Sequence, residues 1–303
     1  MYALKRILVP TDFSRHAEEA LEHAVMFGAR HQAELTLLHV DEFAVGPLGA
    51  REESSAAVVA YRKEKAEFIL ENLRALARLC EGRNVSVRTA VKEGRAYKVI
   101  VEEGEREAYD LIVLSTRGLT HLSQNLIGST SERVVRLSRQ PVLSVQQGPR
   151  LGGAIGSVLC PTDLSPAGNV GISYALSIAR QGNGVLYIQY VSELEQPEPV
   201  EAIRQRLPDL KEHHPEADRV KVEYVFDRDV EASNSIIRFA EDRDVSLIVM
   251  STHGKKGLRR VYIGNNTAEV VRQSRTPVLT VMHPFHKRVF SRPATERTDV
   301  PFV

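Results

Sequence analysis

An internal repeat constrains the fold more than any other feature of this chain, because similar segments are expected to adopt similar structures. RILVPTDFS at 6–14 recurs as SVLCPTDLS at 157–165, an offset of 151 residues. DLIVLSTRG at 110–118 recurs as SLIVMSTHG at 246–254, where the offset has fallen to 136. The second copy therefore lacks 15 residues that the first copy has between these two segments.

The length of the chain agrees with two domains, since 303 residues exceed what one hydrophobic core usually supports. The repeat predicts a first domain at 1–148 and a second at 155–283. A glycine-containing linker, QQGPRLGGAIG, joins them at 146–156. Residues 284–303 show no clear period and are expected to form an irregular C-terminal tail.

Each copy alternates short apolar runs with segments of helical period, which is typical of parallel strands joined by helices. The predicted class is α/β, with a five-stranded parallel sheet in each Rossmann-like domain. Four prolines in EQPEPVEAIRQRLPDLKEHHPEA predict a short helix there in the second copy. The predicted strands are 6–9, 34–40, 85–91, 111–115 and 142–145, then 157–160, 185–191, 220–226, 247–251 and 278–281. The predicted helices of the first copy are 15–30, 57–80, 95–108 and 130–138.

Composition excludes several classes of protein. Hydrophobic residues make up 43% of the chain and charged residues 26%, as in ordinary globular proteins, and a net charge of +1 favours neither nucleic acid nor a membrane as partner. We find no secretory signal or spanning apolar stretch, so we expect a cytoplasmic location. Cys80 and Cys160 match no metal or redox spacing and are expected to be small buried residues.

A glycine-rich loop follows the fourth predicted strand of the first copy, in STRGLTHLSQNLIGSTSER at 115–133. Glycines here would also suit a tight strand-to-helix turn with no ligand. However, Gly128 directly precedes a predicted helix, whose N-terminal amides attract anions. Ser129, Thr130 and Ser131 could cap that helix or donate to a bound phosphate. The loop fits neither a P-loop nor the dinucleotide fingerprint.

The two copies resemble domains of the universal stress protein family, over nearly the whole chain up to about His283. The nucleotide-binding branch of that family has glycine, two residues, glycine, nine residues, then glycine followed by serine or threonine. The first copy departs from this pattern only at its first position. The matching residues are Ser115, Gly118, Gly128 and Ser129 in the first copy, and Ser251, Gly254, Gly264 and Asn265 in the second. Asn265 stands where the pattern has a hydroxyl residue, and Thr267 provides a hydroxyl two residues later.

The resemblance implies a sheet order of 3-2-1-4-5 in each domain, a pseudo-twofold relation between the domains, and a ligand at the carboxyl ends of the strands. It implies that Asp12 and Asp163, in the PTD segments, contact a ribose or a metal on the phosphates. Each aspartate could instead cap a helix or form an Asx-turn with the following serine. The other implied contacts are Pro10, Thr11 and Thr162 in these turns, and Val40 and Val191, whose backbone groups would meet the adenine edge.

The implied ligand is ATP, ADP or AMP, with Mg²⁺ on the phosphates, bound better by the first domain. Arg117, His253, Lys255 and Lys256 flank the loops and either neutralise phosphate charge or are simply solvated. The ten histidines complete no zinc-like set, so no structural metal is expected. Without an evident catalytic base or P-loop lysine, we expect at most slow hydrolysis. The alternatives are a nucleotide-free interaction scaffold and a hydrolytic enzyme.

The fifth strands, PVLSV and PVLTV, are apolar on both faces and would be edges in this sheet order. Exposed apolar edges invite pairing. We therefore expect strands 142–145 and 278–281 to pair antiparallel within one chain, which would give an intramolecular pseudo-dimer. A homodimer would be a further level of assembly.

Overall fold

The structure is a computed structural model, and it describes residues 4–42, 56–118, 128–146, 155–193, 199–207, 210, 217, 219–252 and 264–282. The chain divides into two compact units, with the main border between residues 154 and 155. The exact domain boundaries predicted from the sequence, 1–148, 155–283 and 284–303, stay a prediction.

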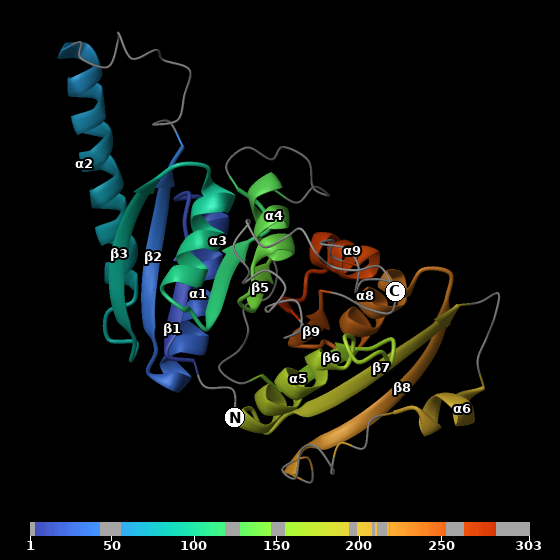
Figure 1. Cartoon of the computed structure of the whole chain (residues 1–303). Coiled ribbons are helices and arrows are strands. Elements are labelled where there is room, and N and C mark those ends of the chain that lie inside the picture. The colour runs from blue at the N-terminus through green and yellow to red at the C-terminus, as the bar shows by residue number, and fades with distance from the viewer. Residues whose placement is uncertain are drawn as a thin grey trace, which may run out of the picture. The chain divides into compact units, whose positions relative to one another are not determined.

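The first unit contains a parallel sheet in the order β3-β2-β1-β4-β5. Figure 1 shows β3, β2 and β1 side by side in this unit. The predicted order 3-2-1-4-5 is therefore present here. The elements are β1 (Arg6–Pro10), α1 (Arg15–His31), β2 (Glu34–Asp41), α2 (Ala56–Leu79), β3 (Ser86–Glu93), α3 (Ala96–Arg106), β4 (Leu111–Ser115), α4 (Ser129–Leu137) and β5 (Val142–Val145).

The second unit repeats this order as β8-β7-β6-β9-β10. The pairs β6–β7, β7–β8 and β6–β9 are parallel. The short helix predicted from the prolines is α6, with six residues, whereas α2 has 24. The elements are β6 (Ser157–Pro161), α5 (Val170–Gln181), β7 (Val185–Glu193), α6 (Val200–Gln205), β8 (Lys221–Asp229), α8 (Ala232–Asp242), β9 (Leu247–Ser251), α9 (Asn265–Gln273) and β10 (Val278–Val281).

The central strands form because they are apolar on both faces. Ile7, Leu8 and Val9 of β1 have no exposed surface, since helices cover both faces of a parallel sheet. Helix α1 packs closely on this sheet through Gly28, where a Cβ atom would lie 2.7 Å from Leu35 Cδ1. The outer strand β3 instead alternates half-buried and exposed residues over much of its length.

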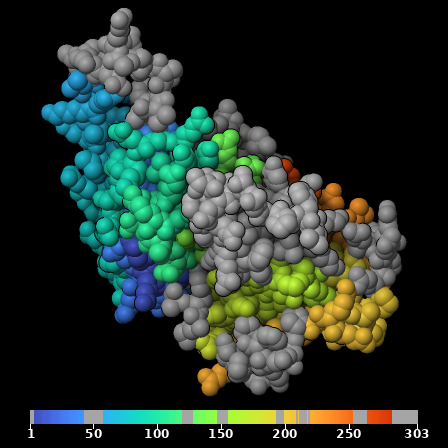
Figure 2. Space-filling view, viewed as in Figure 1, coloured from blue at the N-terminus to red at the C-terminus, as the bar shows by residue number. Residues whose placement is uncertain are grey.

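Helix α2 lies at the surface of the first unit, where its blue atoms are visible in Figure 2. Ile69, Leu73 and Leu76 form its buried face, at the spacing of an amphipathic helix. Other large apolar side chains of α2 are exposed: Val59, Tyr61, Phe68, Leu70 and Leu79.

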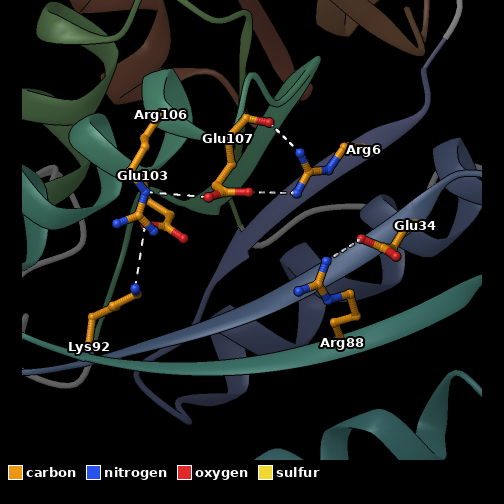
Figure 3. A network of polar contacts seen from close by, with 7 residues as sticks. All are labelled: Arg6, Glu34, Arg88, Lys92, Glu103, Arg106 and Glu107. Carbon is orange, nitrogen blue, oxygen red and sulfur yellow. Dashed lines mark hydrogen bonds and ion pairs between the residues drawn. The ribbon is translucent and has the colours of Figure 1, made fainter.

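Ion pairs tie α3 to the strands of the first unit (Figure 3). Arg6 of β1 donates to the carboxylate of Glu107 at 3.2 Å and also to its carbonyl oxygen, at the end of α3. Glu103, which is only 8% exposed, accepts from Arg106 at 2.6 Å and lies 3.9 Å from Lys92 of β3. These contacts hold the C-terminal half of α3 to β1 and β3.

The contact with Arg6 makes the stability of the protein depend on pH. The hydrogen bond from Arg6 holds the pKa of Glu107 below the ordinary glutamate value of 4.5. A depressed folded-state pKa stabilises the protein above the unfolded-state value, and this contribution is lost as the pH falls through the folded value. Urea unfolding should therefore show Glu107→Gln less stable than wild type at pH 7, with the difference shrinking below pH 4.5.

Glu102→Gln is the matched control, because Glu102 lies on the same helix and its side chain is 65% exposed, 3.7 Å from Lys98. Its stability should differ little from wild type at either pH. A Glu107→Gln difference that stays constant down to pH 3 would contradict the assignment to Arg6.

Candidate functional site

The carboxyl ends of β1 and β4 meet at one edge of the first sheet. β1 pairs in parallel with β2 on one side, through Pro10 and Leu38, and with β4 on the other, through Leu8 and Ile112. The strand order changes direction between β1 and β4, and ligands of open α/β sheets bind at such switch points. The residues after β1 and β4 are therefore the candidate site.

The turn after β1 is built from local hydrogen bonds. The amide of Thr11 donates to the carbonyl of Leu38 at 2.9 Å, which continues the β1–β2 pairing by one residue. The amide of Phe13 donates to Thr11 Oγ1, and that of Ser14 to Asp12 Oδ1, both at 3.0 Å. The Asx-turn alternative for Asp12 is therefore observed, and Ser14, not Asp12, caps α1 through the amide of Ala17.

The second carboxylate oxygen of Asp12 faces the loop after β4. A Cβ atom on Gly118 would lie 2.7 Å from Asp12 Oδ2, closer than two such atoms can approach. Glycine at 118 thus makes room for the carboxylate. The loop begins at Ser115, whose hydroxyl accepts a hydrogen bond from the amide of Arg117 at 3.1 Å. Asp12 and Gly118 therefore lie against each other at this edge of the sheet.

Helix α4 begins beside the end of β4, with no side-chain cap from its N-cap residue. Its N-cap is Gly128, in extended conformation, whose amide donates to the carbonyl of Thr116 at 2.8 Å. Ser129, Thr130 and Ser131 are the first three helical residues, so of the two alternatives for them, capping the helix or donating to a phosphate, the N-cap is not observed. Ser131 instead donates its hydroxyl to the carbonyl of Ser115 at 2.6 Å, which fixes the helix to the end of β4.

Val40 presents backbone groups beyond the end of β1. The last β1–β2 partners are Pro10 and Leu38, while β2 continues to Asp41. Peptide groups of alternate residues face the same side of a strand, so those of Val40 face the β1 side, as those of Leu38 do. They therefore lie where a planar ring edge could continue the pairing of the sheet.

The second unit repeats most of this geometry. Its turn after β6 uses Thr162 and Asp163 as the first unit uses Thr11 and Asp12, with hydrogen bonds of 3.0 Å to Leu164 and Ser165. Val191 likewise lies two residues beyond Gln189, the last partner of β6. The corresponding contacts at the start of α9 run from the Gly264 amide to the Thr252 carbonyl at 2.8 Å and from the Thr267 hydroxyl to the Ser251 carbonyl at 3.0 Å.

Asn265 is the exposed first residue of α9. Gly254, which the sequence places in the second site, lies outside the described residues, as do His253, Lys255 and Lys256.

The two aspartates differ in their surroundings. Asp163 Oδ1 accepts from both the amide and the hydroxyl of Ser165, at 3.0 and 2.6 Å. A Cβ atom on Gly168 would lie 2.2 Å from the same oxygen, and Ser251 donates to the carbonyl of Gly168 at 3.4 Å. The segment after Asp163 thus folds onto the aspartate and onto the end of β9. Helix α5 begins at Val170, four residues later than α1 does in the repeat.

Sequence reasoning missed the conformation of the residue after each aspartate. Phe13 and Leu164 have φ angles of 64° and 61°, in the left-handed region that bulky residues rarely adopt. Phe13 also stacks on His39, with ring centroids 4.5 Å apart. The only signal in the sequence was that both copies place an apolar residue in the middle of this polar turn.

No group of three or more metal-ligating side chains occurs among the residues that the structure describes. Both cysteines are buried, as expected, and burial raises the pKa of the Cys160 thiol to about 12, so this thiol stays protonated. Among the described helices, none has the length and apolar character needed to span a membrane.

Comparisons with known proteins agree with the repeat and with the fold. The model of the universal stress protein family matches residues 3–146 and again 155–282. A universal stress protein of Mycolicibacterium smegmatis is 24% identical over 91% of this chain and 96% of its own length. One from Methanocaldococcus jannaschii is 34% identical over 47% of this chain and 82% of its own length.

Among solved structures, a universal stress protein from Archaeoglobus fulgidus has a TM-score of 0.73 and 21% identity, and the match covers 93% of this chain and 97% of that one. This likeness concerns the fold. The double match to the family model goes further, because it spans both repeats found in the sequence. The chain therefore belongs to the universal stress protein family and carries two copies of the family's domain in tandem.

Proposed function

We propose that the first domain binds an adenine nucleotide, preferably ATP with Mg²⁺, in the crevice between the ends of β1 and β4. The protein would act in the cytoplasm as a stress-response regulator or scaffold whose state depends on nucleotide occupancy. The observation that carries the proposal is the meeting of Gly118 with the Asp12 carboxylate, near an α4 N-terminus whose N-cap residue is a glycine.

Each part of the crevice suits one part of the nucleotide. Peptide amides at the start of α4, together with the positive end of the helix dipole, suit the phosphate chain. Asp12 suits a ribose hydroxyl or a phosphate-bound Mg²⁺, since a carboxylate accepts hydrogen bonds and is a hard oxygen ligand. The peptide groups of Val40 suit the edge of adenine. Pro10 and Thr11 would line the turn between the base and the ribose.

The second domain is proposed as the weaker site. Its aspartate already accepts two hydrogen bonds from Ser165, and Ser251 donates to the carbonyl of Gly168 across the end of β9. A nucleotide would have to displace these contacts. The alternative for the whole protein is a scaffold of the same fold that binds no nucleotide.

Addition of ATP and Mg²⁺ should raise the melting temperature of the full chain. A ligand at a hundred times its dissociation constant stabilises the folded state by about 2.7 kcal/mol. For a domain of this size we expect an increase of roughly 5–10 °C in differential scanning calorimetry. An unchanged melting temperature would favour the nucleotide-free scaffold. Phosphate release with multiple turnovers per minute would instead favour the enzyme alternative.

Gly118→Ala should weaken ATP binding by about ten- to a hundredfold. The new Cβ would force the Asp12 carboxylate to move, and a lost hydrogen bond to a charged group costs about 1.5–3 kcal/mol. Isothermal titration calorimetry measures the change. Gly156→Ala is the matched control, because a Cβ there meets no atom within 4 Å. Equal affinities of the two variants would contradict the placement of the ligand.

The assembly is part of the proposal. We infer that Val142–Val145 and Val278–Val281 pair within one chain and so leave no apolar edge for association. Light scattering coupled to size exclusion should then give a mass of 33.8 kDa. Twice that mass at micromolar concentration would contradict the expected monomer and indicate that a homodimer forms.

A further inference from the structure

The turn that carries Asp12 contains an aromatic residue in an unfavourable conformation. Phe13 has a φ of 64°, which brings the Cβ atom of a non-glycine residue close to its own backbone. Such a conformation persists only where surrounding contacts determine it. The hydrogen bonds of the turn hold the backbone here, and the contacts of the Phe13 side chain show which elements the turn is fixed to.

The ring of Phe13 is held between two other elements of the first unit. It stacks on His39 of β2, at a centroid distance of 4.5 Å and an interplanar angle of 18°. It also meets Phe68 of α2 edge to face, at 6.4 Å and 86°. Both arrangements are favourable geometries for aromatic pairs. The side chain of Phe13 is thus fixed by residues that are distant in the sequence.

His39 also fixes the residue on the other side of Asp12. Its Nδ1 lies 2.9 Å from the carbonyl oxygen of Thr11, and a carbonyl only accepts, so Nδ1 carries the proton. One imidazole ring therefore contacts both Thr11 and Phe13, the two neighbours of Asp12 in the chain. Movement of Asp12 relative to β2 would have to break one of these contacts.

The second unit provides an internal comparison without this stack. Leu164 has nearly the same φ, 61°, but no ring. Tyr190 occupies the position of His39 in the repeat, and its ring faces the guanidinium of Arg206 at 5.9 Å. There, Asp163 Oδ1 is held by Ser165 and lies against Gly168 of its own turn.

We propose that Phe13 and His39 are positioning residues of the first-domain site, which hold the turn so that Asp12 Oδ2 lies against Gly118. The expected change in ATP affinity rests on the proposed nucleotide function. The position of the Asp12 carboxylate can be tested without a ligand. Neither side chain is assigned a contact with the nucleotide.

Phe13→Leu is the decisive variant, because Leu164 shows that leucine adopts this conformation in this chain. The variant should fold and lose only the stack. We expect its ATP affinity, measured by isothermal titration calorimetry, to fall about tenfold, the lower end of what loss of a supporting contact costs at ligand sites. Phe13→Tyr keeps a stacking ring and should bind as wild type does. Leu164→Ala, at the same place in the second domain, should leave the affinity unchanged.

Ligand-free crystal structures of wild type and Phe13→Leu test the positioning directly. Asp12 Oδ2 should lie against Gly118 in wild type and away from it in the variant. An unmoved carboxylate would overturn the inference, as would equal loss of affinity in Phe13→Leu and Phe13→Tyr, or a moved carboxylate with unchanged affinity. Absence of ATP binding by wild type would instead contradict the proposed function, and the ligand-free structures would still decide the position of Asp12.

Discussion

The parallel pairing of β1 with both β2 and β4 is the constraint on which the rest of the site depends. It brings three carboxyl ends to one edge of the sheet, with β1 in the middle. β1 has five residues and β2 eight, and β2 therefore extends past β1. Because β2 continues past the end of β1, the peptide groups of Val40 have no partner strand on the β1 side. The turn after β1 and the loop after β4 begin at this same edge of the sheet. The same mismatch recurs between β6 and β7.

Much of this arrangement could be predicted from the sequence, for identifiable reasons. The central strands are apolar on both faces, and each strand can be recognised in both copies of the repeat. For these reasons the predicted strands fall within a few residues of the observed ones. The starts of α4 and α5 could not be predicted as well. Hydroxyl residues suggested a cap on α4, but Ser131 is used to bind the end of β4 instead. At α5, the segment SPAGN delays the helix to Val170.

The two copies have also diverged inside their sheets. Gln189 of β7, at the position of Leu38 in the first copy, is fully buried and donates to Ser235 of α8 at 3.0 Å. Ser235 donates in turn to Asp227. Burial opposes ionisation of Asp227, but hydrogen bonds from Ser235 and Arg228 outweigh it, and the pKa lies below the ordinary value. The second domain thus keeps the fold with a polar network where the first has a buried leucine, Leu38.

Comparison of the two copies separates the left-handed backbone after the aspartate from the stacking of Phe13 on His39. The left-handed residue after the aspartate occurs in both copies, at a cost of about 1–3 kcal/mol each. Since Leu164 adopts it without an aromatic partner, the conformation follows from the turn itself, in which Thr and Asp side chains accept the next amides. The stack of Phe13 on His39 therefore does not create the strained backbone. It fixes instead where the whole turn, with its Asp12 carboxylate, lies relative to β2.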